Sequence, residues 1–576
     1  MTGIVHTVHK HVVEQQNRSV RLAFASTLRA LWRKHGMKSQ IGLAISGGVD
    51  SMALASLCSS MRDWGPLTER EGNGDKRKRP RFTAFIVDHQ LRSHSTSEAC
   101  RVSSKLSRLD ISSQVLELDW KPYGDPHKLP NLESTARRLR YQATGRACRE
   151  QGINTLLFGH HQDDQAETVL MRMLANYSGA GLRGIKSEAA IPECAGLYGV
   201  DHSGDCEAAD EESRLLSREL EGGMRFESGG VSIARPLLAF DKEQLIAICK
   251  QDGVGWFEDH TNAVVTLTVR NTIRSLLNSD VLPEALQKNS LLAVAAMKAR
   301  ESEEAETAAA KALEQMPISL DVRSGSATLT VPKERTLAVS GTARAMLLRK
   351  MIGMVAPAGN LSLQDLYAAT EYVLGLDENG ADTNVSTIVQ VAGVSIARVL
   401  DDADSDFGNC VFQFSRSMPT QKEKTISQIA LWSSHQSGQS GDGHDLKQWT
   451  HWQLWDGRYW LRVCLPKGTG TWNVQIIVRF LVKDDIRKLR RSLDKEEAER
   501  LQQALDLAKG SLRFTCPALV MIERPDDGDA IERVVALPSL GWSCKSWDRH
   551  QGPDLPNRRS WDIRYKHVEL EHTVSA

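Results

Sequence analysis

Short apolar runs alternate with helical patterns between residues 41 and 280, and this alternation limits the possible folds more than any other feature of the sequence. The apolar runs predict strands at 41–45, 82–88, 111–118 and 155–160. Helical patterns cover 51–61, 95–109, 133–150 and 162–175. Buried strands separated by helices indicate an α/β fold with a doubly wound parallel sheet. Because such sheets bind ligands at the carboxyl ends of their strands, functional residues are expected directly after the predicted strands.

The chain of 576 residues is too long for one hydrophobic core and is expected to form several domains. A basic segment at 1–38 contains the first helix, and the α/β domain follows at 39–285. A helical connector and mixed domain is predicted at 286–424, beginning with a long helix at 288–316. Alternating apolar and polar runs at 425–576 predict an α+β or β-rich C-terminal region.

Two segments interrupt the alternation and are expected to be disordered surface insertions. Residues 65–81 are rich in Gly, Pro and basic residues, and residues 187–230 are rich in Gly and acids. A linker or long loop is predicted at 433–445. Nine of the thirteen tryptophans lie between 432 and 561, and they favour a packed β core over a surface that stacks RNA bases.

Composition excludes several classes of protein. Lys+Arg and Asp+Glu each number 72, so the net charge is zero and an anionic partner must be held by local patches. No apolar run reaches the ~18 residues of a membrane-spanning helix, which excludes an integral membrane protein. The ten cysteines include no CxxC pair, which argues against a disulfide scaffold, a zinc ribbon and a thioredoxin-like redox site.

The strongest local signal is the sequence SGGVDS, which lies between a predicted strand and a predicted helix. The segment comprises Ser46, Gly47, Gly48, Val49, Asp50 and Ser51. Its glycines allow a tight turn that presents backbone N–H groups, and the helix start and the serines add further donors. These features predict a cradle for a phosphate group, although no Walker A sequence occurs in the chain.

A second cluster, HHQDDQAET at 160–168, follows the fourth predicted strand. On a helix, residues spaced three and four apart share one face, and here these are His160, Asp163, Asp164 and Glu167. An imidazole and three carboxylates on one face can bind Mg²⁺ through oxygen ligands and assist proton transfer. Capping of the helix start by acids is the structural alternative. Zinc is disfavoured because no cysteine lies near and no HExxH occurs.

A GxGxxG match at 179–184 follows a predicted helix, whereas a Rossmann dinucleotide site needs a strand before it. A turn that offers Arg183 to an anion is the better interpretation. Local basic patches must bind any nucleic acid, and the predicted phosphate contacts are Arg183, Arg235, Arg270 and Arg274.

Six motifs occur in a fixed order along the first half of the chain. They are SGGVDS, VDHQLR followed by SEA, NLESTARRLRY, HHQDDQAET, GAGLRGI, and RPLL followed by WFEDHTN and RNTIR. Together they resemble the N-terminal domain of the tRNA(Ile)-lysidine synthetase family, within the PP-loop ATP pyrophosphatase superfamily. The resemblance covers residues 20–285, is faint beyond 290, and implies a HUP-like PP-loop ATPase fold.

The resemblance implies a two-step reaction on the wobble cytidine of an isoleucine tRNA. ATP adenylylates the C2 oxygen of the base, and the amine of free L-lysine then displaces AMP to give lysidine. Carried onto this sequence, 46–51 would cradle the pyrophosphate, and Asp50 and Asp164 would hold Mg²⁺ or the lysine amine. His160 would act beside them, and Arg140 would steady the phosphates or the activated intermediate.

Other functions remain open at this point. Alternatives are another PP-loop ATP pyrophosphatase such as a tRNA thiolase, an inactive tRNA-binding protein, and a small-molecule amide-forming ligase. Thiolation is disfavoured because no cysteines are paired. A homodimer is left open. The first 38 residues carry seven Lys/Arg and one acid, Glu14, which predicts the mitochondrial matrix, with the cytoplasm as the alternative.

Overall fold

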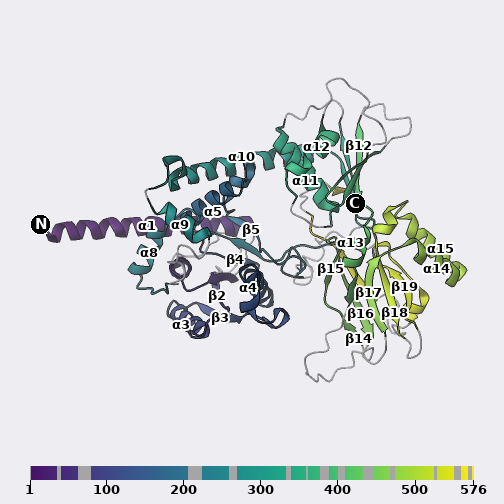
Figure 1. Ribbon diagram of the computed structural model, residues 1–576, viewed down its shortest axis with the longest axis horizontal. Helices are drawn as coiled ribbons and strands as arrows, with labels where there is room; N and C mark the ends of the chain where they lie inside the picture. Colours follow the sequence, from purple (N-terminus) through teal and green to yellow (C-terminus); the bar gives the residue numbers. More distant parts are fainter. Residues whose placement is uncertain are drawn as a thin grey trace, which may run out of the picture. The chain divides into compact units, whose positions relative to one another are not determined.

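The computed structural model describes residues 2–35, 40–61, 80–204, 224–258, 269–279, 281–332, 339–357, 361–375, 388–399, 409–431, 447–466, 474–524, 529–549, 560–568 and 574–575. The chain divides into two compact units (Figure 1). The first combines Met1–His202 with Gly229–Glu303, and the second combines Ser203–Ser228 with Glu304–Ala576. The predicted regions 286–424 and 425–576 thus contribute together to the second unit.

The first unit contains a six-stranded sheet in the order β3-β2-β1-β4-β7-β5. Its strands are β1 (Gln40–Ile45), β2 (Arg81–Asp88), β3 (Ser112–Glu117), β4 (Thr155–Leu157), β5 (Glu188–Ala190) and β7 (Ser232–Ala234). All neighbours pair in parallel except β5, which runs antiparallel to β7. The chain passes from β1 through β2 to β3 and then resumes at β4 on the other side of β1. The doubly wound sheet is therefore confirmed, and its ligand crevice is expected at the ends of β1 and β4.

Helices cover both faces of this sheet. They are α1 (Thr2–His35), α2 (Val49–Ser60), α3 (Ser95–Arg108), α4 (Leu132–Glu150), α5 (Gln162–Leu174), α8 (Lys242–Gln251) and α9 (Val269–Leu277), with α10 (Lys288–Glu314) continuing into the second unit. Alternate strand residues point to opposite faces. Accordingly, Ile86 packs in the core that contains residues of α1, α2, α3 and α8, whereas Phe85 packs with residues of α4.

The N-terminal helix α1 is joined to the first unit. Leu28 and Trp32 are buried, while Leu22 is 51% exposed. The Asn17 side chain donates to Gln251 Oε1 at 2.6 Å, and Arg21 contacts Asp252 at 2.5 Å. From Asn17 onward, α1 is therefore part of the domain. Among the described residues, no helix is both long enough and apolar enough to cross a membrane.

The insertion 187–230 is predicted to be disordered, but its described parts are folded. Strand β5 extends the sheet, and Ile191 and Val200 are buried. Strand β6 (Arg225–Phe226) belongs to the second unit and pairs there with β21 (Trp561–Tyr565). The glycines make turns: Gly230 has φ +91°, and a Cβ there would lie 2.7 Å from two backbone atoms. Most of the predicted insertion 65–81, and the predicted linker 433–445, lie outside the described residues.

In its described residues, the second unit contains three mainly antiparallel sheets that share a hydrophobic core. The first has the order β10-β11-β12-β9-β8-β22, the second β13-β17-β18-β19-β20, and the third β14-β16-β21-β6 with β15 on β16. The strands are β8 (Ile318–Asp321), β9 (Ser326–Val331), β10 (Ile388–Val391), β11 (Val394–Val399), β12 (Cys410–Arg416), β13 (Ile429–Leu431), β14 (Lys447–Trp449), β15 (Gln453–Trp455), β16 (Tyr459–Pro466), β17 (Val474–Phe480), β18 (Pro517–Glu523), β19 (Ile531–Leu537), β20 (Trp542–Ser543) and β22 (Val574–Ser575). The helices are α11 (Gly341–Val355), α12 (Tyr367–Leu374), α13 (Gln421–Ile426), α14 (Lys483–Ser492), α15 (Lys495–Asp506) and α16 (Lys545–Arg549). These sheets confirm the predicted β-rich C-terminal character.

The described tryptophans of this unit mostly fill its core, as the packed-core interpretation predicts. Those that are buried are Trp452, Trp455, Trp460, Trp542, Trp547 and Trp561. Trp449 differs, because it is 42% exposed and the Arg462 guanidinium lies 4.8 Å from its ring.

Candidate active site

The predicted phosphate cradle is a tight turn between β1 and α2. Gly47 has φ +86°, a left-handed conformation, and a Cβ at this position would lie 2.6 Å from Val102 Cγ2. The Ser46 N–H donates to Ser51 Oγ at 3.3 Å, and the Ser51 hydroxyl donates to Gly48 O at 2.9 Å. The two serines therefore hold the turn closed. The loop leads into the N-terminus of α2, where the helix dipole favours an anion.

Phe257, from the predicted WFEDHTN motif, packs against this loop. Its backbone N–H donates to Gly47 O at 2.9 Å. Lys105 Nζ of α3 lies 3.8 Å from the centre of the Phe257 ring. The aromatic residue thus fixes the outer side of the cradle, while residues 259–262 of the motif lie outside the described residues.

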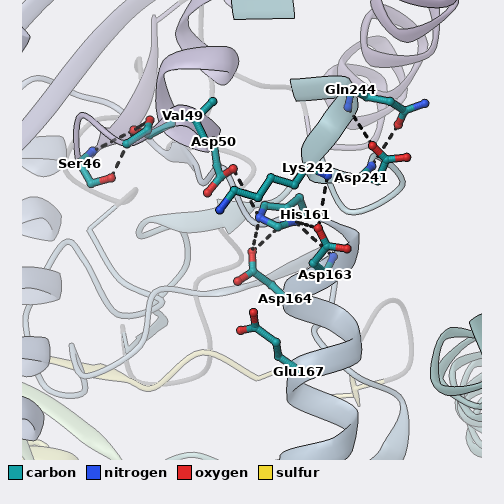
Figure 2. Close-up of polar contacts among 12 residues, drawn as sticks. Ser46, Val49, Asp50, His161, Asp163, Asp164, Glu167, Asp241, Lys242 and Gln244 are labelled. Carbon is teal, nitrogen blue, oxygen red and sulfur yellow. Dashed lines mark hydrogen bonds and ion pairs between the residues drawn. The ribbon is translucent and has the colours of Figure 1, made fainter. Parts of the chain in front are cut away.

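His161 lies between the two predicted metal-binding carboxylates (Figure 2). Its Nε2 is 3.4 Å from Asp50 Oδ1 and 3.6 Å from Asp164 Oδ2. Its Nδ1 accepts the Asp163 backbone N–H at 3.2 Å, which places the imidazole proton on Nε2, between the carboxylates. Burial opposes protonation of His161, but Asp50, Asp164 and Asp163 raise its pKa overall.

His160, the histidine selected from the sequence, has a different environment. It precedes α5 instead of lying on its acidic face, and it stacks on Phe158 with ring centres 5.6 Å apart. Arg235 Nε donates to His160 Nδ1 at 3.3 Å. Burial, together with Arg235 and Arg270, lowers the His160 pKa to about 4, so this imidazole is neutral at pH 7. The sequence indicated a histidine pair, but only the fold shows that His161 faces the acids, because it occupies the N-cap of α5.

Arg270 and Arg274, two of the predicted tRNA contacts, pair with acids of α5, and their role toward tRNA stays a prediction. Arg270 Nη2 lies 2.7 Å from Asp164 Oδ1, and its Nε lies 2.7 Å from Glu167 Oε2. Arg274 Nε lies 2.6 Å from Glu167 Oε1. Glu167 is 2% exposed and needs compensating charge at this depth. Helix α9 thus neutralises the acidic face of α5.

The other two predicted tRNA contacts also bind within the first unit. Arg183 Nη1 donates to Ser302 Oγ at 3.0 Å, and Arg235 Nη1 donates to Lys186 O at 2.7 Å. The loop that carries Arg183 is held by Arg172, which donates to Gly181 O and Gly184 O. These arginines therefore shape the loops beside the site.

Arg140 lies on α4, and no hydrogen bond or ion pair joins it to Asp50, His161 or Asp164 within the described part of the chain. Its Nε is buried and makes no hydrogen bond to any described residue, and the same holds for His89 Nδ1, directly after β2. Burial and the charge of Arg140 lower the His89 pKa, which shows that the two groups are close enough to interact. Two polar atoms at the end of β2 are thus ready to bind a polar ligand group.

The start of α8 is joined to the start of α5 beside these residues. The Lys242 backbone N–H donates to Asp163 Oδ2 at 3.3 Å, and the Gln162 N–H donates to Phe240 O at 2.9 Å. Asp241 and Gln244 form a capping box that begins α8 (Figure 2). Asp163 is also paired with Lys288 of α10. Asp163 thus joins helices and lies 3.5 Å from His161 Nδ1, whereas Asp50 and Asp164 face the Nε2 atom of the same imidazole.

The donor set fits a magnesium ion that is bound mainly by its nucleotide. No group of three or more His, Cys, Asp or Glu side chains suited to a metal occurs among the described residues. Mg²⁺ usually takes one or two protein carboxylates, with phosphate oxygens and water completing its octahedron. Asp50 Oδ1 is buried, and its polar neighbour is His161 Nε2 at 3.4 Å, a weak contact that leaves lone pairs of this carboxylate for a metal ion. Asp164 would bind the ion as well once its Oδ1 had released Arg270.

Comparisons with known proteins agree with the loop and the sheet. Residues 20–281 match the PP-loop domain family. The chain is 27% identical over 534 residues to a probable tRNA(Ile)-lysidine synthase from Schizosaccharomyces pombe, covering 91% of this chain and 96% of that protein. It is 32% identical over 258 residues to tRNA(Ile)-lysidine synthase from Bradyrhizobium diazoefficiens, covering 45% of this chain and 56% of that protein. Among solved structures, the U34-tRNA thiolase NcsA from Methanococcus maripaludis is 14% identical, covering 50% of this chain and 80% of that chain with a TM-score of 0.32.

The sheet order, the SGGVDS turn and the family match define a PP-loop enzyme that uses ATP. Within this class, the chain is a homologue of the tRNA(Ile)-lysidine synthases. The match to the bacterial relative spans about half of that protein, whereas the match to the fission-yeast relative extends through most of both units.

Proposed function

We propose that this protein ligates L-lysine to C2 of the wobble cytidine of an isoleucine tRNA, at the expense of ATP. One observation carries the proposal: the SGGVDS turn after β1 and the acidic cluster after β4 meet at His161, which lies 3.4 Å from Asp50 and 3.6 Å from Asp164. The homology over 91% of the chain to a probable tRNA(Ile)-lysidine synthase supports this choice of reaction.

In the first step, the C2 oxygen of cytidine attacks the α-phosphate of ATP, and pyrophosphate leaves. The backbone donors of residues 46–51 and the N-terminus of α2 would stabilise the charge that develops on the leaving group. Mg²⁺ held by Asp50, with Asp164 as its second carboxylate, would supply further charge neutralisation. Arg140 and His89 offer donors at the end of β2 for the phosphate or the base.

In the second step, the lysine amine forms a bond to C2, the bond from C2 to the oxygen breaks, and AMP leaves. Asp164 already carries one cation, Arg270, at 2.7 Å, so its position suits an ammonium group. The carboxylate would orient the amine and accept the proton that the amine loses. His161 would act as a positioning residue that keeps Asp50 and Asp164 at a fixed separation.

The cysteine that follows the phosphate loop in the chain does not support thiolation as the alternative reaction. Sulfur transfer needs an accessible thiolate. Cys58, the cysteine of α2 after the phosphate loop, is fully buried, and burial raises its pKa above the usual range. An inactive tRNA-binding role gains no support either, because the phosphate loop and the acids are assembled together.

The proposal is tested by incubating the protein with ATP, radiolabelled lysine and an isoleucine transcript that carries a wobble cytidine. We expect AMP release and one lysine per tRNA, both lost when the wobble base is uridine. AMP formation without incorporated lysine, or equal labelling of both transcripts, would contradict the assignment.

We also propose that the protein acts in the mitochondrial matrix. The basic, acid-poor first 38 residues support this address, whereas the contacts of Asn17 with Gln251 and of Arg21 with Asp252 show that part of this segment belongs to the domain. A fusion of residues 1–40 to a fluorescent reporter should reach mitochondria. Diffuse signal from this fusion and from the tagged full-length chain would overturn the proposal.

A further inference from the structure

Lys242, in the first turn of α8, extends its side chain into the candidate active site (Figure 2). Its backbone N–H donates to Asp163 Oδ2 at 3.3 Å, which fixes the start of α8 beside the start of α5. From there the half-buried side chain runs toward Asp50 of the phosphate loop. Lys242 therefore belongs to this site, although it lies outside the motifs that predicted the site from the sequence.

The position of Lys242 depends on the packing of α8 against α2, the helix that follows the phosphate loop. The Cys249 thiol of α8 donates to Val49 O, in the first turn of α2, at 3.7 Å. Leu245 of α8 and Leu54 of α2 are buried in the same hydrophobic core. Helix packing thus determines where the lysine stands relative to the phosphate loop.

The Lys242 ammonium has no partner of its own in the described part of the chain, where it forms neither a hydrogen bond nor an ion pair. A neighbouring cation of the site differs in this respect, because Arg270 pairs with Asp164 at 2.7 Å. Asp50 Oδ1, toward which the lysine extends, has a weak contact with His161 Nε2 at 3.4 Å. A cation and a carboxylate that approach without pairing suit a ligand that offers an anion to the first and a metal ion to the second.

Helix stability does not explain a lysine at this position. A cation in the first turn of a helix is opposed by the helix dipole. Asp241 and Gln244 already form the capping box that begins α8. Half-burial also costs the ammonium part of its hydration. All of these unfavourable contributions become smaller when an anion binds to the ammonium.

We propose that Lys242 is a catalytic residue whose ammonium binds the α-phosphate of ATP, an inference that rests on the proposed function. In the proposed reaction, residues 46–51 hold the pyrophosphate group. Ser46 and Lys242 approach Asp50 from opposite sides in Figure 2. Since the α-phosphate lies between the pyrophosphate and the base, a cation on the side away from Ser46 meets the α-phosphate. Lysine suits this task because its ammonium is a compact charge with three donors.

The Lys242 ammonium would act in both steps of the reaction. In the first step, the bond from the C2 oxygen to the α-phosphorus forms while the bond to the pyrophosphate oxygen breaks. Charge is then spread over the non-bridging oxygens, which the ammonium stabilises. In the second step, the bond from C2 to oxygen breaks and the AMP oxygen keeps the electron pair, so the same phosphate gains negative charge. Lys242 stays protonated throughout, which separates its role from that of Asp164.

The test compares Lys242→Met with Lys250→Met, which removes an exposed lysine from the last turn of the same helix. Binding of AMP and of pyrophosphate to the full chain is measured by calorimetry with Mg²⁺, in the absence of tRNA and lysine. We expect Lys242→Met to weaken AMP binding about 10- to 100-fold, the usual loss for one hydrogen bond to a charged group. Its pyrophosphate affinity should be nearly unchanged, and Lys242→Arg should recover part of the AMP affinity. Lys250→Met should bind both ligands like the wild type.

The outcomes separate this inference from the proposed function. Unchanged AMP affinity in Lys242→Met, folded by circular dichroism, would overturn the inference even when the wild type forms lysidine. Loss of pyrophosphate affinity alone would overturn it too, because the lysine would then hold the leaving group. Equal losses in Lys250→Met would attribute the effect to net charge and also contradict the assignment. If the wild type makes no lysidine, the proposed function fails, and AMP binding still decides the role of Lys242.

Discussion

Arg270 is seated on Asp164, with Nη2 2.7 Å from Oδ1, at the point where the proposed reaction needs a cation. The same guanidinium reaches the buried Glu167, so α9 supplies positive charge to the acidic side of α5. A carboxylate that stably holds a guanidinium can also hold a lysine ammonium or Mg²⁺. Arg270 and the substrate cation would therefore exchange on Asp164 during the reaction cycle.

Replacement of Asp50 or Asp164 by alanine should abolish AMP formation while the protein stays folded. The two carboxylates lie on either side of His161. Removal of a group that stabilises transition-state charge commonly lowers kcat by about 10²–10³. AMP release with tRNA and lysine is the measurement, and thermal unfolding is the control. Near-normal turnover of either variant would contradict the metal and amine roles.

Replacement of His161 should impair catalysis more than the same change at His160. His161→Ala removes the imidazole that positions Asp50 and Asp164, and we expect kcat to fall about 100-fold, because a misplacement of ~1 Å can cost on the order of 10² in rate. His160→Phe preserves the stack on Phe158 and should reduce kcat less than tenfold. KM for lysine is measured alongside, because loss of positioning should raise it only for the His161 variant. The reverse ranking would identify His160 as the residue that matters.

His160 should make the protein less stable as the pH falls from 6.5 to 4. Its pKa is about 4 in the folded protein and near the ordinary 6.5 when unfolded, so in this window the unfolded state binds the proton and the folded state does not. The free energy of unfolding therefore decreases as the pH falls. Urea unfolding at pH 7 and pH 5 should show a smaller difference for His160→Phe than for the wild type. An equal difference in the two proteins would show that His160 does not cause it.

Gly47→Ala should damage the phosphate loop through both strain and a clash. The position has φ +86°, and its Cβ would lie 2.6 Å from Val102 Cγ2. Strain alone costs on the order of 1–3 kcal/mol, and displacement of Val102 adds to this loss. Gly253→Ala is the matched control, because it has φ +66° but no heavy atom within 4 Å of the Cβ. A larger loss of stability and of ATP affinity at Gly47 is expected; equal effects would mean that the contact with Val102 is unimportant.

Asp456→Ala should be among the most destabilising single changes in the second unit. Asp456 lies 2.8 Å from Arg458 and 3.3 Å from Arg416, and all three side chains are at most 2% exposed. Breaking a buried ion pair by removing one partner costs about 3–5 kcal/mol, because the remaining charge stays buried. Asp562→Ala provides the control, since Asp562 is 36% exposed and pairs with Arg462. Chemical denaturation should separate the two variants clearly; similar losses would show that Asp456 is not needed to neutralise the arginines.

The sequence by itself determined the α/β fold of the first unit and the two segments of its site. Periodicity is a local property, so the predicted strand at 41–45 and helix at 51–61 correspond to β1 and α2 within a few residues. The SGGVDS turn could also be placed, because glycines between a strand and a helix permit only a few backbone conformations. Parallel strands then require both segments to lie at one edge of the sheet.

Only the tertiary structure decided which side chains meet at that edge. Local pattern cannot distinguish His160 from His161, because the N-cap geometry of α5 turns one imidazole toward Asp50 and the other toward Arg235. It also cannot show that Arg270 binds Asp164, since the pair is separated by 106 residues and depends on the packing of α9 against α5. The sequence pattern does not distinguish an arginine that neutralises a buried acid from one that faces solvent. That difference is one of burial and distance, which only the folded chain defines.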